Sequence, residues 1–184
     1  MPAWVWILIA IAAVIVLVLA VFGWLQARRK RLKDTFGPEY DRAVSDAPNR
    51  REAEAELEER RKRRDDMEIR PLSRSAAEHY SHEWQGIQVR FVDDPVGATR
   101  DADRLVERVM TDRGYPMEDF DARADLISVD HPTVTENYRA AHATYLAYDQ
   151  GDASTEDLRQ AMVHYRSLFE ELVSADEREA EEVR

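Results

Sequence analysis

The side chains in this sequence that could carry chemistry are five histidines and the carboxylates beside them. His79 and His82 lie three positions apart, and Glu83 follows the second histidine. A zinc peptidase helix instead needs HExxH, which places two imidazoles four positions apart on one face with the glutamate between them. Because that spacing is absent and no further ligands are evident, the sequence predicts no metal site and favours solvated helix residues.

Asp130 and His131 form the second candidate, directly before Pro132. One hypothesis is an acid–base pair that works with neighbouring tyrosines, which would make the protein an enzyme of unrecognised type. The favoured hypothesis is a helix start, because an acid followed closely by proline is typical of a capped N-terminus. We therefore expect Asp130 to cap a helix. His142 and His164 are expected at the edge of a helical core.

Other sequence patterns of enzymes are absent. The chain contains no GxSxG nucleophile motif, no phosphate-binding glycine loop and no dinucleotide fingerprint, and its 6 glycines are scattered. Cysteine is absent as well, which excludes disulfides, thiol catalysis and thiolate metal sites. The sequence thus predicts neither a catalytic residue nor a cofactor.

The element that organises the chain is a hydrophobic run over residues 3–25, AWVWILIAIAAVIVLVLAVFGWL, which contains no charged residue. As a helix with ~1.5 Å rise per residue it is about 34 Å long, enough to cross a hydrocarbon core of roughly 30 Å. A cleaved signal peptide would need basic residues before a shorter apolar core and a small-residue cleavage site after it. Here basic residues follow the run, so we expect residues 1–27 to be a retained transmembrane anchor.

Residues at both ends of this run are typical of a membrane interface, because amphipathic rings favour the headgroup region and basic residues beside a span remain cytoplasmic. The predicted interface residues are Trp4, Trp6, Trp24, Arg28, Arg29, Lys30, Arg31 and Lys33. The sequence therefore predicts a single-pass protein of the inner (plasma) membrane, with its N-terminus outside and its C-terminal domain in the cytoplasm. The rival topology places that domain outside the cell. No small-residue spacing indicates helix pairing, and the oligomeric state stays open.

Charge is distributed unevenly along the 184 residues. The net charge is -11, but residues 28–33 carry +5 and residues 67–184 carry -13. An acidic domain is repelled by nucleic-acid phosphates, whereas a basic segment is attracted to anionic lipid. We expect the lipid bilayer as one partner and no binding of nucleic acid.

Two segments connect the anchor to the domain. Residues 28–48 are typical of a basic juxtamembrane segment, in which FGP (36–38) ends the first helix and a short helix over 39–44 places Phe36 and Tyr40 at the lipid interface. Residues 49–71 indicate a charged helix with i,i+4 ion pairs and no continuous apolar stripe. This predicts a solvated spacer, about 27 Å long over 49–66, that holds the domain away from the lipid. In the alternative, the block 60–64 binds a phosphate-bearing partner.

Residues 72–173 show the apolar periodicity of a compact helical domain. Helices are predicted over 75–92, 95–113, 117–127, 132–149 and 155–173, with Asp94 and Ser154 as N-caps and Gly114 as a C-terminal glycine. Only residues 86–92 could instead form a strand, and the acidic tail 174–184 is expected to fray. The predicted fold class is all-α, with one N-terminal transmembrane helix, a charged helical spacer and a small bundle of about five helices.

Several stretches resemble a known family. They are FGPEYDRAV (36–44), IRPLS (69–73), RFVDDPVGA (90–98), RGYPMEDF (113–120), SVDHP (128–132) and STEDLRQAMVHYRSLFEEL (154–172). Over essentially the whole part after the anchor, the chain is similar to a family of uncharacterised actinobacterial single-pass membrane proteins, labelled as membrane or secreted proteins. This resemblance implies no activity, ligand or site residue. The turn over 145–152 is also similar to one tetratricopeptide helix pair, which implies only a helical hairpin because that fold needs about three repeats.

A helical domain on a stalk, without a recognisable site, favours an interaction or scaffold module. We therefore expect a membrane-tethered cytoplasmic protein that binds an unidentified protein partner. The competing hypothesis is the enzyme with a site around Asp130 and His131, which requires these side chains to converge in a pocket.

Overall fold

The computed structural model describes residues 3–116, 119–150 and 152–182, without the side chains of residues 3–10, 13, 149 and 175–182. The described chain contains only helices: α1 (Ala3–Phe36), α2 (Pro38–Asp46), α3 (Arg50–Asp65), α4 (Arg74–Arg90), α5 (Pro95–Arg113), α6 (Phe120–Asp130), α7 (Pro132–Asp149) and α8 (Thr155–Glu182). The predicted all-α class is confirmed. The strand alternative over residues 86–92 is wrong, because α4 continues to Arg90.

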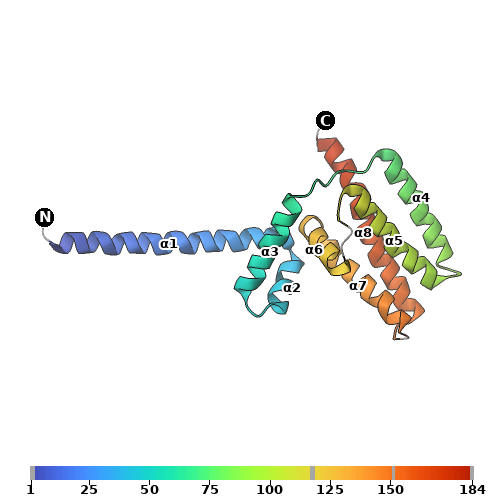
Figure 1. Ribbon diagram of the computed structural model, residues 1–184, viewed down its shortest axis with the longest axis horizontal. Helices are drawn as coiled ribbons and strands as arrows, with labels where there is room; N and C mark the ends of the chain where they lie inside the picture. Colours follow the sequence, from blue (N-terminus) through green and yellow to red (C-terminus); the bar gives the residue numbers. More distant parts are fainter. Residues whose placement is uncertain (1–2, 117–118, 151, 183–184) are drawn as a thin grey trace.

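Helix α1 projects from the rest of the molecule as one long rod (Figure 1). It ends where the sequence predicts, because Gly37 adopts a φ of 46° and Pro38 occupies the start of α2. A positive φ is open to glycine and strained for other residues. The described apolar side chains of α1 between Ile11 and Leu25 are largely exposed, from 39% for Leu25 to 65% for Val16.

Within the described residues, none of the helices combines the length and the apolar character needed to cross a membrane. The structure confirms that the predicted anchor is helical. It does not confirm that this helix crosses a membrane. Trp4 and Trp6, predicted at the interface, lie among the residues whose side chains are not described.

Helices α4 to α8 form a bundle around one apolar core. Helices α7 and α8 pair along their length, α5 packs against α8, and α4 covers α5 (Figure 1). Residues of α5 and α8 such as Leu105, Met110 and Leu168 are fully buried in this core, as the apolar periodicity predicted over residues 72–173 requires. Trp84 of α4 stacks on Phe169 of α8 with ring centroids 5.0 Å apart, which joins α4 to α8 across the core.

Most helix ends of the bundle lie at the capping residues that the sequence predicts. Asp94 accepts a hydrogen bond from the Gly97 N–H, and Ser154 caps α8 by accepting one from the Asp157 N–H. Three predicted boundaries are wrong. Helix α6 begins at Phe120, where Asp119 caps it, and ends at Asp130 instead of residue 127, while the predicted start at residue 117 lies outside the described residues. Helix α8 continues to Glu182 instead of ending near residue 173.

Gly114 gives a testable consequence of one such helix end. It terminates α5 with a φ of 99°, and a Cβ placed there would lie 2.6 Å from the Glu68 carbonyl oxygen. We expect Gly114→Ala to lower the free energy of unfolding by about 2 kcal/mol or more, through left-handed strain and this clash. Gly86→Ala is the matched control, because a Cβ at that position in α4 meets nothing within 4 Å and should stabilise by about 0.5–1 kcal/mol. Chemical denaturation of both variants checks the prediction, and a Gly114 variant as stable as wild type contradicts it.

A second apolar cluster joins α1, α2 and α3 and is here called the α1–α3 cluster. It consists of Leu32, Phe36, Tyr40, Ala43, Ala53 and Leu57, and Val129 of α6 packs against it. Phe36 and Tyr40, which we expected at the lipid interface, are buried at 0% and 3% exposure.

The expectation of a fully solvated spacer over residues 49–66 is also wrong. Helix α3 forms as predicted and is capped by Asn49, but one of its faces is buried against α1, α2 and α6. Ala53 and Leu57 supply too few apolar positions to mark this face in the sequence. The apolar cluster therefore connects the end of α1 to the bundle.

Candidate functional site

A buried group of paired charges lies where α2 and α3 meet α6 and α7. It is called here the buried quartet and consists of Glu39, Arg60, Asp125 and Arg139. The Asp125 Oδ1 lies 2.9 Å from the Arg60 Nη1 and 2.6 Å from the Arg139 Nη2. The Glu39 Oε2 lies 3.5 Å from the Arg139 Nη2 and 4.0 Å from the Arg60 Nη1. Two carboxylates therefore balance two guanidinium groups from four different helices.

Burial makes this pairing significant for stability. The side chains of Glu39, Arg60 and Arg139 are 2%, 10% and 11% exposed, respectively. Asp125 is 22% exposed and borders an open groove of about 410 Å³ between the α2–α3 corner and α6 and α7. Charges removed from water to this extent are stable only when they are paired. The quartet has the character of a structural connection between helices, since its charged side chains pair with one another across α2, α3, α6 and α7.

Asp130 does not cap a helix as predicted. It is the last residue of α6, so the cap position before α7 falls on His131, whose side chain makes no capping hydrogen bond. The Asp130 Oδ2 instead accepts hydrogen bonds from the Arg64 Nε at 2.6 Å and the Tyr115 hydroxyl at 2.5 Å. Burial and the negative charge of Asp130 raise the pKa of Tyr115, which favours a neutral hydroxyl that donates.

His131 points to a different partner from its neighbour Asp130. Its side chain is buried, and its Nδ1 lies 3.5 Å from the Glu171 Oε1 of α8. Neither Asp130 nor His131 lines any of the three grooves described on this molecule. The two side chains are thus adjacent in sequence but take partners from different helices, Arg64 of α3 for Asp130 and Glu171 of α8 for His131.

The burial of His131 predicts a pH-dependent stability. Burial, more than any charge, lowers its pKa from the ordinary value of 6.5, although Asp130 and Glu171 oppose the shift. The unfolded chain therefore binds the proton first as the pH falls below 6.5, and the folded state loses stability there. We expect His131→Gln to remove a slope of at most about 1.4 kcal/mol per pH unit in that window. Urea titrations at several pH values measure this slope, and the exposed His79→Gln is the control. An unchanged slope in the His131 variant contradicts the prediction.

Of the other histidines, His142 meets an acid, because its Nδ1 lies 3.8 Å from the Asp103 Oδ1 of α5. His79 and His82 are exposed on α4, and Glu83 accepts a hydrogen bond from Arg108 of α5. His142 stacks on Phe120 with ring centroids 3.7 Å apart, at the edge of the core as predicted. Among the described residues no group of three or more potential ligands could hold a metal ion.

The predicted interface residues between Trp24 and Lys33 lie around the junction of α1 with α2 and α3. Trp24 is 63% exposed, and the Arg28 guanidinium lies 5.9 Å from its ring centroid. Arg29 pairs with Glu54 of α3 at 3.3 Å, and Lys33 pairs with Asp41 of α2 at 3.8 Å. Lys30 and Arg31 are exposed on α1. Arg29 and Lys33 of the basic segment are therefore paired at the helix junction, whereas Lys30 and Arg31 are exposed.

Comparison with protein-family models, with curated proteins and with solved structures gives no significant match. The resemblance to an actinobacterial membrane protein family stays a prediction.

The residues that sequence reasoning missed are Glu39, Arg60, Asp125 and Arg139. They lie on four helices, and their pairing joins positions as far apart in the chain as Glu39 and Arg139. No local spacing could have identified them, because each resembles an ordinary solvated charge in its own helix. The sequence marks the cationic block 60–64 but not the partners of Arg60 and Arg64 on α6, which are Asp125 and Asp130.

Proposed function

We propose that this protein is a single-pass membrane-tethered module in which α1 is the anchor and the acidic bundle binds a protein partner in the cytoplasm. The observation that carries the proposal is the apolar run over residues 3–25, which contains no charge and continues into one uninterrupted helix. The side chains of this run are described from Ile11 onward, apart from residue 13. They are exposed and do not pack against the bundle. An exposed apolar surface of this length in a helix is typical of contact with lipid.

The orientation is inferred from charge. Five basic residues within 28–33 follow the apolar run, and basic residues beside a span favour the cytoplasmic side. The bundle beyond them carries most of the negative charge, since residues 67–184 have a net charge of -13. This composition disfavours contact with anionic lipid or nucleic acid and suits a partner with a basic surface.

Alkaline extraction of membranes tests the anchor. We expect the full-length chain to remain with the membrane pellet, and a variant with Leu17→Arg and Leu19→Arg to be released, because each central charge opposes insertion by roughly 2.5–3.5 kcal/mol. Release of the wild-type chain under the same conditions contradicts the anchor.

Cysteine labelling tests the orientation, because the natural chain has no cysteine. A single Arg100→Cys substitution on the exposed side of α5 should react with a membrane-impermeant maleimide only after the cells are permeabilised. Labelling in intact cells would place the bundle outside and reverse the proposed topology.

The partner is tested by affinity capture of the solubilised full-length protein from its native host. A variant with the exposed acids Glu78, Asp93 and Asp152 changed to their amides is the comparison. We expect this variant to capture less of the partner protein than the wild-type chain does. Equal capture by both chains argues against an acidic docking surface.

A further inference from the structure

Helix α3 meets α1 directly after the apolar run ends. It crosses the last turns of α1 (Figure 1), where Leu32 and Leu57 are buried in the α1–α3 cluster. Arg29 of α1 pairs with Glu54 of α3 at 3.3 Å, which fixes the lengthwise position of one helix on the other. One side of α3 is therefore held at the level of the residues that follow Leu25.

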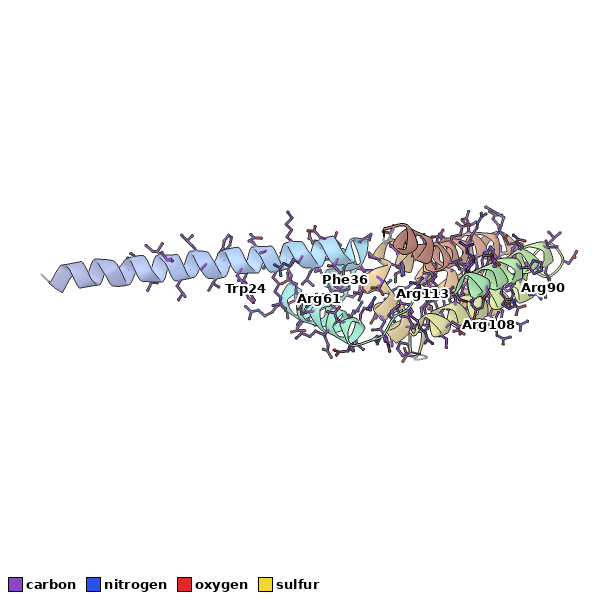
Figure 2. The ribbon with its side chains drawn as sticks, turned by 90° about the horizontal axis from the view of Figure 1, so that it is seen from above. Trp24, Phe36, Arg61, Arg90, Arg108 and Arg113 are labelled. Carbon is purple, nitrogen blue, oxygen red and sulfur yellow. The ribbon has the colours of Figure 1, made fainter. Side chains whose placement is uncertain are left out.

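This crossing creates a groove of about 650 Å³ between the two helices. Apolar side chains of Trp24 and Leu32 form part of its lining, and four cations, Arg28, Arg31, Arg61 and Lys62, surround it. Figure 2 shows Trp24 and Arg61 near each other on the side of α1 where α3 lies, whereas Arg90 and Arg108 lie at the far end of the molecule. The groove is thus amphipathic and sits at one end of the fold.

The cations of the groove are incompletely neutralised. Asp34 and Glu58 are its acids, which leaves a net charge of +2 for the lining. Arg61 is held by Glu58 at 2.8 Å and Asp65 at 2.9 Å. Within the described part of the chain, Arg28, Arg31 and Lys62 form no ion pair with a carboxylate.

Local electrostatics agree with a positive groove. A hydrogen bond from Arg61, and to a smaller degree the charges of Arg28 and Lys62, lower the pKa of Glu58. Like charges that converge without enough counter-charge repel one another, and an anion between them would relieve this repulsion.

We propose that this groove between α1 and α3 binds the headgroup phosphate of an anionic phospholipid. The proposal rests on the proposed anchoring by α1, because only an anchored α1 places Trp24 and the cations at headgroup level. Basic pockets between helices at the membrane surface bind anionic headgroups, and tryptophan favours the same depth. The apolar lining suits the glycerol and upper acyl region of a lipid, which a free phosphate lacks.

The test uses the full-length protein in nanodiscs of phosphatidylcholine with a minor share of phosphatidylglycerol. After release into detergent, native mass spectrometry counts the phosphatidylglycerol molecules that remain bound. The groove variant is Arg28→Gln, Arg31→Gln, Lys62→Gln. The matched control is Arg74→Gln, Arg100→Gln, Arg104→Gln, which removes the same charge from exposed bundle arginines that have no ion pair in the described chain.

We expect phosphatidylglycerol to be enriched among the lipids bound to the wild type and to the control, relative to its share in the disc. In the groove variant this enrichment should fall at least about tenfold. Equal retention by groove variant and control overturns the proposal, while incorporation into the discs shows independently that the anchor is intact. A chain that fails to enter the discs at all contradicts the anchor instead. Circular dichroism confirms that both variants keep the helical fold.

A second arm distinguishes lipid from free phosphate. Inorganic phosphate is added to the detergent-released wild type that carries phosphatidylglycerol. Retention of the lipid in its presence supports a lipid headgroup site. Displacement of the bound phosphatidylglycerol by inorganic phosphate overturns the assignment to lipid, provided that the phosphate concentration does not alter the bundle that carries the control arginines.

Discussion

Replacing Phe36 by alanine is expected to lower the local free energy of unfolding of the α1–α3 cluster by about 3–5 kcal/mol. Phe36 has 0% exposure and packs with Tyr40 and Leu57, so its removal leaves a cavity that α3 cannot fill without moving. Few apolar side chains hold α3 in place, and the loss of this aromatic ring should therefore detach α3 from α1 (Figure 2 shows Phe36 at this junction).

Hydrogen exchange of the full-length chain in detergent measures this effect. The amides of α3 should exchange about a hundredfold faster or more in the Phe36→Ala variant, while those of α5 and α8 change little. Phe22→Ala is the matched control, because Phe22 is 61% exposed on the same helix and its removal creates no cavity in the cluster. Equal exchange of α3 in the two variants contradicts the assignment of Phe36 to the packing that holds α3.

The second large effect is expected from the buried quartet. Asp125→Asn removes the carboxylate that lies closest to both Arg60 and Arg139 and leaves an excess positive charge in a site with little water. Breaking one partner of a buried charge pair costs about 3–5 kcal/mol, and we expect about 3 kcal/mol here because Asp125 borders an open groove.

The control for this substitution lies one helical turn earlier. Asp121 is 89% exposed and lies 3.9 Å from the same Arg139, so Asp121→Asn should change the free energy of unfolding by less than about 0.5 kcal/mol. Guanidinium denaturation of the two variants compares them directly. If both substitutions destabilise to the same extent, the quartet is no more than a set of surface charges.

The bundle could be predicted from sequence because its determinants are local. Tyr80, Trp84 and Ile87 recur at helical spacing and are all buried, and Asp94 and Gly114 mark the ends of α5 within one or two residues. Each of these signals lies within one helix, where apolar periodicity and capping chemistry act together.

The position of α3 could not be predicted, because it depends on contacts between distant segments. Its buried face includes Glu54 and Arg60, which resemble solvent-facing charges until their partners Arg29 and Asp125 are known. The prediction that Asp130 caps a helix fails for a similar reason. The Asp-His-Pro sequence is typical of a helix start, but α6 extends to Asp130 and leaves its carboxylate to Arg64 of α3. In both cases tertiary pairing of charges overrides the local signal.

Helix α1 has a mechanical consequence for the whole molecule. It runs unbroken from Ala3 to Phe36, and its final turns are clamped by α2, α3 and α6. Within the described residues, α1 therefore contains no break that would let the bundle rotate independently of this helix. Inserting a single residue after Leu25 would swing the bundle by about 100° around the axis and advance it by ~1.5 Å. The direction in which the bundle faces around the α1 axis is consequently set by the number of residues in α1.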